Sequence, residues 1–96
     1  MAFEWDEDNR ESHLVKHGVD FRDVTPMFDG PTVETVDDRH NYSETRINAL
    51  GEAGGRVYAV AYTWRHANRR IISARKANAR EQRTYYARVE RWGAAS

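Results

Sequence analysis

The amino-acid sequence predicts an α+β fold in which two N-terminal helices precede a four-stranded antiparallel sheet and a C-terminal helix closes the chain. Three observations support this fold. Residues before position 30 carry helix-capping signals, residues 32–77 alternate between apolar and polar side chains, and a further capping signal follows at Asn78. With 96 residues and no internal repeat or Pro/Gly-rich linker, the chain is expected to form one domain over residues 1–96.

The first helix is marked by its two ends. Phe3–Trp5 is apolar enough for a short edge strand, and Asp6 follows it as an N-cap. The helix is expected to run to about His17, because Gly18 suits the left-handed position that ends a helix. Few of its side chains are apolar, so it should lie largely in solvent.

A second helix is expected from an N-cap at Asp20 to Phe28, where apolar residues recur at helical spacing. Pro26 conflicts with an unbroken helix, because a proline inside a helix removes a hydrogen bond and strains the preceding turn. Two interpretations stay open: the helix is kinked, or it restarts at Thr25 with Pro26 as its first residue.

Four segments rich in Val, Ile, Tyr and Thr alternate in polarity with a period of two, which is typical of strands. Short connections at Glu52–Gly55 and Arg65–Asn68 favour hairpins, so consecutive strands should pair antiparallel as a meander. The expected strands are Thr32–Asp37, Thr45–Leu50, Arg56–Trp64 and Arg69–Ala77.

A C-terminal helix is expected after Asn78, which forms a capping box with Glu81 three residues later. Gly93 should end this helix. The larger side chains recur at helical spacing, so one face should pack on the sheet. These side chains are Gln82, Tyr85, Tyr86, Val89 and Trp92.

Composition excludes several classes of protein. The chain has no cysteine, which excludes disulfides, thiolate catalysis and cysteine-ligated metal centres. No apolar run approaches the roughly 18 residues of a membrane span. The acidic N-terminus lacks the apolar stretch of a signal peptide, so a cytoplasmic location is expected.

His13 and His17 have the spacing of a helical metal pair but lack the accompanying glutamate, so neither a metal nor a cofactor is expected.

The charges are divided sharply along the chain, although the formal net charge is zero. Residues 1–44 carry 12 acidic and 4 basic side chains, a net charge of −8, and residues 45–96 carry 3 acidic and 11 basic side chains, a net charge of +8. One interpretation is that the two halves pair with each other. The favoured interpretation is that the second half presents a basic face to phosphate groups, since phosphate binding depends on local potential.

The last strand concentrates basic residues. A strict period of two places Arg69, Ile71, Ser73 and Arg75 on one face and Arg70, Ile72, Ala74 and Lys76 on the other. Because arginine is rarely buried without a partner, Arg75 suggests either an ion pair with Glu44 or Glu81, or a phosphate site. Arginine with His, Tyr and Glu is also what metal-free RNA cleavage requires: a base, an acid, and guanidinium groups that stabilise the phosphorane charge.

The sequence from Phe3 to Tyr86 resembles the BrnT family (DUF497) of type II toxins. The matching pieces are FEWDEDNR, VKHGVDF, DDRHNYSETR, GGRVYAVAYT and RIISARKANAREQRTYY, in this order. The resemblance implies a RelE-like fold and a ribonuclease that inhibits translation. It also implies a BrnA-type antitoxin that forms a heterotetramer with two copies of each chain and alone contacts DNA. The chain departs from the family pattern at Pro26, in the WRHAN hairpin and beyond Val89.

The resemblance also implies site residues. Those expected to take part in catalysis are Arg75, Arg70, Arg46, Lys16, His17, Glu44 and Tyr86, and His40 is a further candidate for contact with RNA. Apart from the resemblance, the basic strand adds Arg69 and Lys76 as expected RNA contacts, and the aromatic residue at the end of a strand adds Trp64.

Several of these residues have a second, structural interpretation. His17 and Lys16 also suit the C-terminal end of a helix, where cations interact with the helix dipole. Trp64 is a candidate for stacking on a base or for anchoring the antitoxin, as is Trp92 for anchoring. Besides a ribonuclease, a non-catalytic RNA-binding module and a protein-interaction domain with a degenerate site remain as alternatives.

Overall fold

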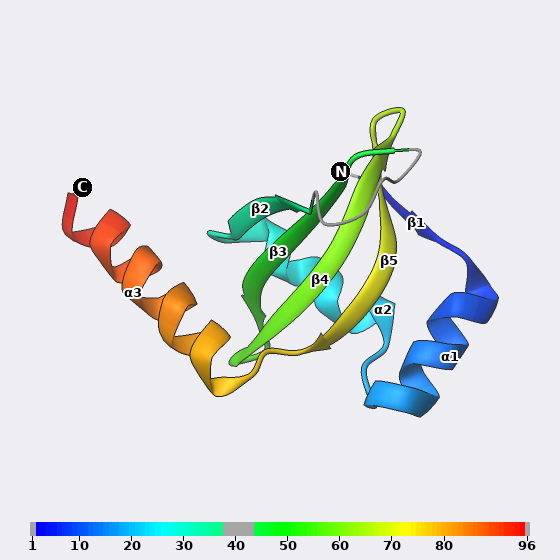
Figure 1. Ribbon diagram of the computed structural model, residues 1–96, viewed down its shortest axis with the longest axis horizontal. Helices are drawn as coiled ribbons and strands as arrows, with labels where there is room; N and C mark the ends of the chain where they lie inside the picture. The colour runs from blue at the N-terminus through cyan, green and yellow to red at the C-terminus, as the bar shows by residue number, and fades with distance from the viewer. Residues whose placement is uncertain (1, 38–43, 96) are drawn as a thin grey trace.

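The computed structural model describes the backbone of residues 2–37 and 44–95 and the side chains of residues 2–37 and 44–90. Its centre is a five-stranded sheet in the order β1-β5-β4-β3-β2 (Figure 1). The strands are β1 (Phe3–Trp5), β2 (Val33–Asp37), β3 (Arg46–Ala53), β4 (Arg56–Arg65) and β5 (Asn68–Lys76). The helices are α1 (Glu7–His17), α2 (Phe21–Val24) followed by the 3-10 helix η1 (Thr25–Asp29), and α3 (Ala79–Ala95).

The predicted four-stranded antiparallel sheet is wrong in strand number and in strand direction. Strands β2 to β5 do pair antiparallel, one after the next. However, β1 adds a fifth strand that runs parallel to β5, with Phe3 opposite Arg69 and Trp5 opposite Ile71. The sheet is therefore mixed, within a fold that remains α+β. A three-residue strand is too short for its alternation to reveal a partner, and this partner lies more than 60 residues away in the sequence.

The first hairpin is tighter than expected. Strand β3 continues to Ala53, beyond the expected end at Leu50, and the turn consists of Gly54 and Gly55 with φ of 59° and 81°. A type I′ hairpin turn requires positive φ at both central positions, which glycine adopts without strain.

Both N-terminal helices begin at the expected caps, Asp6 and Asp20, whose carboxylates accept hydrogen bonds from backbone N–H groups of the first turn. Gly18 ends α1 with φ of 69°, as expected. The helix after Asp20 does not run unbroken, because it restarts as η1 at Thr25 with Pro26 in the first turn. Proline has no N–H to donate and is tolerated only there. Of the two interpretations left open, the restart is confirmed.

A β-bulge in β5 changes the expected alternation of its side chains. The register between β4 and β5 shifts at Ala61/Tyr62, which makes Ile72 an extra residue. The prediction that Arg69 and Arg75 share a face is therefore wrong, because the extra residue moves them to opposite faces. One face carries Arg70, Ser73 and Arg75, and the other carries Arg69, Ile71, Ala74 and Lys76.

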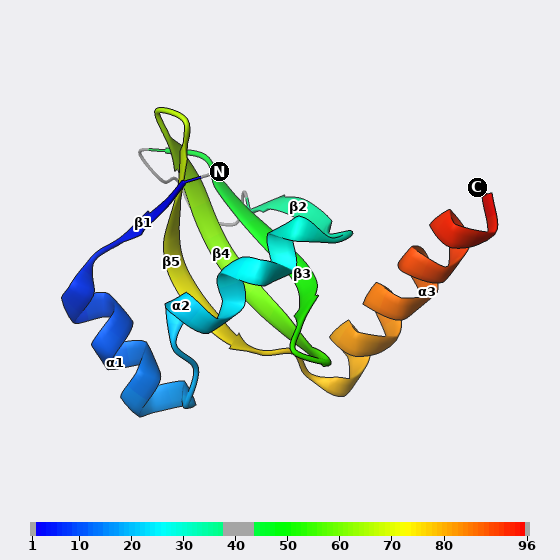
Figure 2. The same cartoon turned by 180° about the vertical axis from the view of Figure 1, so that it is seen from behind.

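Helices α2 and η1 lie across one face of the sheet, which we term the covered face (Figure 2). Gly51 of β3 lies under η1, and a Cβ atom at this position would come within 3.0 Å of the Met27 side chain, so glycine allows the close approach. Fully buried residues of this core include Phe21, Val24, Met27, Val60, Tyr62 and Ile71. None of the described helices lies across the opposite face, termed the open face, which is turned toward the reader in Figure 1.

Helix α3 begins at the expected capping box, in which Glu81 N donates to Asn78 Oδ1 at 2.8 Å and Asn78 N donates to Glu81 Oε1 at 2.9 Å. Among its described side chains only Tyr85 is buried. Val89, in the third turn, packs against the cluster of Val33, Val57, Ala77 and Tyr85, so the predicted packing on the sheet extends to Val89, and the helix also projects away from the sheet (Figure 1). The expected end at Gly93 is wrong, since α3 continues to Ala95.

Candidate functional site

A groove of about 650 Å³ lies on the open face of the sheet and is lined by residues of α1, the central strands and α3. We term it the open-face groove. In Figure 1, α1 and α3 lie on opposite sides of the sheet. Helix α1 forms one wall, the central strands form the floor, and the first turns of α3 form the opposite wall. The side chains that line it include Asn9, His13, Arg46, Asn48, Ala59, Ala61, Ser73, Arg75, Glu81, Thr84 and Arg88.

The floor of the open-face groove is made of small side chains. Ala61 lies between Asn48 and Ser73 on the neighbouring strands, and Ala59 lies opposite Arg75. Alanine and serine rise only one or two atoms above a sheet, whereas arginine extends several ångströms further. The centre of this face is therefore hollow, and the arginines stand at its rim.

An ion pair on the α3 wall holds the guanidinium group of Arg75. Its two terminal nitrogens donate to the two carboxylate oxygens of Glu81 at 2.7 and 2.8 Å. This confirms one of the partners expected for Arg75, and the same carboxylate completes the α3 capping box. The hydrogen bonds raise the pKa of Arg75 and lower the pKa of Glu81, so both groups stay charged at neutral pH. One terminal nitrogen of Arg75 also donates to the Lys76 carbonyl oxygen at 3.4 Å. The side chain remains 46% exposed, and the other N–H groups of its five-donor fork can reach a ligand.

The α1 wall is attached to the sheet at the β-bulge. Asn9 Nδ2 donates to the carbonyl oxygen of Ile72, the extra residue of the bulge, at 2.6 Å. The bond fixes α1 beside β5. Because His13 follows Asn9 by four residues, it lies on the same side of the helix, and it lines the open-face groove.

His13 is the titratable group of the α1 wall. Its ring centre lies 5.4 Å from that of Phe21 and 5.3 Å from that of His17. Nδ1 is buried and has no hydrogen-bond partner among the described residues. Burial, and then the positive charges of His17 and Lys16, lower the pKa of His13 below its ordinary value of about 6.5. The ring is therefore neutral at pH 7 and able to accept a proton.

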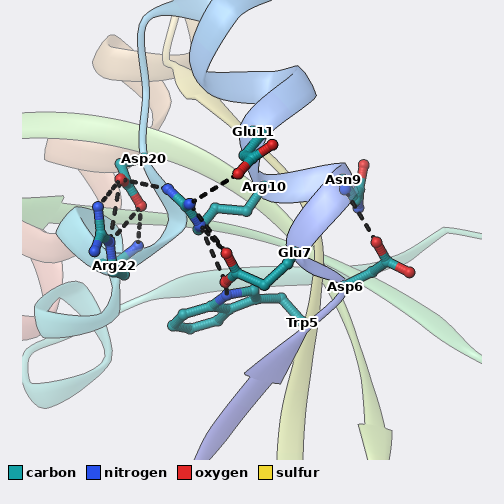
Figure 3. Close-up of polar contacts among 8 residues, drawn as sticks. All are labelled: Trp5, Asp6, Glu7, Asn9, Arg10, Glu11, Asp20 and Arg22. Atoms are coloured by element: carbon teal, nitrogen blue, oxygen red, sulfur yellow. Dashed lines mark hydrogen bonds and ion pairs between the residues drawn. The ribbon is translucent and has the colours of Figure 1, made fainter.

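Arg10 joins the two N-terminal helices and so positions this wall (Figure 3). Its guanidinium group donates to Glu7 on α1 at 3.0 Å and to Asp20, the cap of α2, at 2.9 Å. Asp20 also accepts a bond from Arg22 at 2.7 Å, and only 8% of its side chain is exposed. The hydrogen bonds from Arg22 are the main cause that lowers the pKa of Asp20 to about 2.

Replacing Asp20 with asparagine is expected to lower the free energy of unfolding by about 2 kcal/mol near neutral pH, because the amide keeps the cap but loses the charge that binds both arginines. The pKa of Asp20 is about 2 in the folded protein against an ordinary 3.8. The folded state thus holds this proton less tightly, and the stabilisation is complete above about pH 5 and fades as the pH falls toward 2. Urea denaturation across this range measures the effect.

The difference in stability between wild type and Asp20→Asn should therefore shrink between about pH 4 and pH 2. Asp23→Asn is the matched control, since Asp23 lies on the same helix and is exposed, and it should change stability by less than about 0.5 kcal/mol at any pH. A difference for Asp20→Asn that is the same at every pH would contradict the electrostatic origin.

Three of the predicted catalytic arginines lie on the open face. Arg75 and Arg46 line the open-face groove, and Arg46 stands opposite Asp37 in the register of β2 and β3. Arg70 points to the same face opposite Thr63, closer to the β4–β5 hairpin and beyond the groove lining.

The other predicted catalytic residues lie away from the open-face groove. Lys16 and His17 are exposed at the C-terminal end of α1. Glu44 forms an ion pair of 3.7 Å with the arginine that ends β4. The hydroxyl group of Tyr86 donates to a carboxylate of β3 at 2.7 Å. Because none of these residues lines the open-face groove, their position does not support the catalytic roles expected of them, which stay predictions.

Arg69, Lys76 and Trp64 lie on the covered face or at its margin. The guanidinium carbon of Arg69 is 4.6 Å from the ring centre of Trp64 and 4.5 Å from that of Phe28. Such cation–π contacts stabilise the fold at this end of the sheet. Because these three residues lie on the other side of the sheet from the open-face groove, the RNA contacts predicted for them would require a second surface.

Two predicted residues lie outside the described part of the chain. His40 falls between the described ranges, and the side chain of Trp92 lies beyond the last described side chain. The RNA contact predicted for His40 and the antitoxin contact predicted for Trp92 stay predictions.

The structure brings Asn9, His13 and Arg88 to the groove, and none of them was predicted from the sequence as a site residue. Helical spacing indicates part of this arrangement. Asn9 and His13 are four residues apart, and the α3 residues Glu81, Thr84 and Arg88 recur every three or four positions, so each set shares one face of its helix. Which face of each helix turns to the sheet depends on docking contacts between distant residues, which spacing does not show.

Arginine supplies the positive charge of the open-face groove: its lining includes Arg46, Arg75 and Arg88, together with the carboxylates of Asp37 and Glu81. Within the described ranges, no three His, Asp or Glu side chains are grouped in a way that could hold a metal ion. No helix described in the structure has both the length and the apolar character needed to cross a membrane.

Comparisons with known proteins agree on one family. A family model described as "Ribonuclease toxin, BrnT, of type II toxin-antitoxin system" matches residues 5–81. The crystal structure of the Brucella abortus ribonuclease toxin BrnT is similar, with 30% sequence identity and a TM-score of 0.63, over 81% of this chain and 97% of that chain. A sequence comparison with curated proteins gave no significant match. The family match includes the floor and the α1 wall of the groove and ends at the first turn of α3.

Proposed function

This chain belongs to the BrnT family of ribonuclease toxins of type II toxin–antitoxin systems, and we propose that it cleaves RNA in the open-face groove. Family membership makes RNA its substrate and an antitoxin its protein partner. The observation that carries the proposal is the construction of the groove. Its hollow floor lies between a rim of Arg46, Arg75 and Arg88 and a wall that holds a neutral His13.

The reaction that this arrangement suits is attack by a 2′-hydroxyl group on the adjacent phosphorus. A base removes the 2′-hydroxyl proton, the O2′–P bond forms, the P–O5′ bond breaks, and the leaving 5′-oxygen takes up a proton. The products end in a 2′,3′-cyclic phosphate and a 5′-hydroxyl group. The phosphoryl oxygens gain negative charge in the transition state, and guanidinium groups can stabilise that charge without a metal ion.

The groove residues take distinct roles in this proposal. Arg75 binds the reacting phosphate through its fork of N–H groups, with Arg46 and Arg88 contributing positive charge from the rim. His13 is the base, because burial keeps its ring neutral. Arg70 extends the basic surface on the same face.

The antitoxin is proposed to be of the BrnA type and to silence the toxin by covering the open-face groove. The complex would contain two copies of each chain, and DNA would be contacted only by the antitoxin. The free toxin would inhibit translation in the cytoplasm, where mRNA is found. We also propose that residues 1–96 act as a single domain, since the described strands form a single sheet.

Digestion of RNA by the purified protein, with analysis of the product ends by mass spectrometry, tests the proposed function. Cleavage should persist in excess EDTA and leave 2′,3′-cyclic phosphate ends. RNA binding without cleavage would favour the alternative, a non-catalytic RNA-binding module. Loss of cleavage in EDTA with recovery in magnesium would contradict the proposed mechanism.

A further inference from the structure

Among the described residues, helix α3 is attached to the rest of the protein along one side of its first three turns, where Glu81 pairs with Arg75, Tyr86 bonds to Glu52 and Val89 packs against the cluster that contains Tyr85. Gln82 Nε2 donates to the Ala77 carbonyl at 3.1 Å, and the hydroxyl group of the buried Tyr85 donates to the Pro31 carbonyl at 2.9 Å. Beyond these contacts the helix extends away from the sheet (Figures 1 and 2). A helix rises 1.5 Å per residue, so the described portion from Ala79 to Glu90 spans roughly 17 Å.

The described side chains of this helix include three arginines and two glutamates. Arg80, Arg83 and Arg88 are exposed, and within the described ranges no hydrogen bond or ion pair involves them. The acidic residues here are Glu81, which is already bound to Arg75, and Glu90. A projecting helix with this charge attracts polyanions at ordinary ionic strength.

Arg88 connects this basic surface to the open-face groove. It lines the groove together with Thr84 and Glu81, which share its side of the helix. At 100° per residue, Arg80 lies about 80° and Arg83 about 140° around the helix from Arg88, so the positive charge passes from the rim of the groove to the outer side of α3. A single strand of RNA bound in the groove has a charged surface to follow where it leaves.

We infer that α3 is an RNA-binding arm that holds the phosphate backbone of the strand flanking the cleavage site, through Arg80 and Arg83 outside the groove. The inference rests on the proposed ribonuclease activity and goes beyond it, because the family match ends at residue 81. RNA is a better fit than the antitoxin as the partner of this surface, since the surface is cationic, solvent-exposed and continuous with the groove. The arm makes cleavage efficiency depend on the length of the RNA.

The test compares two substrates with the full-length protein. An RNA of about four nucleotides fills the groove alone, and one of about 20 nucleotides also reaches the arm. For the variant Arg80→Ala/Arg83→Ala, kcat/KM for the long RNA should fall about 3- to 10-fold, and kcat/KM for the short RNA should stay unchanged. The slope of log kcat/KM against log salt concentration for the long RNA should become shallower by about 1.4, since each contact with a single strand contributes about 0.7.

Two further variants sharpen the test. Arg80→Lys/Arg83→Lys keeps both charges and should keep the wild-type salt slope. Arg56→Ala removes one exposed arginine whose register position, opposite Ala53, is on the covered face. This variant should leave kcat/KM unchanged for both the long and the short RNA. Thermal melts confirm that each variant is folded.

The outcomes separate the arm from the ribonuclease. If the wild type cleaves neither RNA, the proposed function fails. If the wild type cleaves both RNAs but the double alanine variant lowers kcat/KM equally for the long and the short RNA, or for neither, the inference that α3 is an RNA-binding arm is wrong. Weaker antitoxin binding with unchanged RNA kinetics would overturn it too, by assigning this surface to the antitoxin.

Discussion

Replacing Arg75 with alanine is expected to lower kcat/KM for RNA cleavage about 10²- to 10³-fold, the usual cost of losing one donor to a developing negative charge. The loss has a second cause, because the Glu81 carboxylate stays on the groove wall without its cation and repels the phosphate. The fold should persist. The ion pair is half-exposed, and such pairs contribute about 1 kcal/mol or less, while the Asn78–Glu81 capping box remains.

Arg75→Lys is the informative control for this result. Lysine keeps the charge but cannot make the forked contact, so its activity should fall between those of wild type and Arg75→Ala. Steady-state cleavage kinetics beside circular dichroism and thermal melts measure both effects. If Arg75→Ala instead loses several kcal/mol of stability, Arg75 is mainly one half of a structural ion pair and the assignment to phosphate binding is wrong.

Replacing His13 with alanine is expected to lower kcat about 10²- to 10⁴-fold, the range typical of a lost general base. The pH dependence gives the sharper evidence. A base acts in its neutral form, so log kcat/KM of the wild type should rise with pH and level off above the pKa of His13, which lies below 6.5. The groups facing His13 are Lys16 and His17 on its own helix and Phe21 of α2.

The alanine variants of His13 and His17 are expected to give opposite results in this experiment. Cleavage rates of the two alanine variants, measured from about pH 5 to pH 8, should show the acid limb abolished in His13→Ala and retained in His17→Ala. If His17→Ala removes the limb and His13→Ala does not, the residue implied by the family resemblance is the base and the position of His13 in the groove is incidental.

Local signals in the sequence predicted the elements whose ends are set by neighbouring residues. Asp6, Gly18 and Asp20 mark helix ends through hydrogen bonds that span two to four positions, so each was predicted correctly. The Pro26 conflict was resolved by the same local chemistry.

Features that depend on contacts between distant residues were not predicted. The parallel pairing of β1 joins Phe3 to Arg69, and no local pattern reports it. The bulge at Ile72 inserts one residue into an otherwise regular strand, and an alternation rule then places every residue on one side of it on the wrong face. This single residue is why Arg69 was expected beside Arg75.

In the candidate site too, features set by neighbouring residues were predicted and features set by distant contacts were not. The partner of Arg75 was among those expected, because Glu81 lies just across the start of α3 and serves as its cap. The choice of histidine was different, because His13 and His17 are equivalent by spacing. Two contacts decide between them: Asn9 with the bulge carbonyl, and Arg10 with Asp20. Both exist only once the helix has docked.

The most direct test of the central claim, that RNA lies in the open-face groove, is an NMR titration with alanine methyl groups as probes. The protein is labelled with ¹³C in its alanine methyl groups and titrated with 2′-O-methyl RNA, which lacks the attacking hydroxyl group and stays intact. The resonances of Ala59 and Ala61, on the groove floor, should shift, and those of Ala53 and Ala74, buried on the covered face, should not. Shifts confined to Ala53 and Ala74 would place the RNA on the other face and contradict the account.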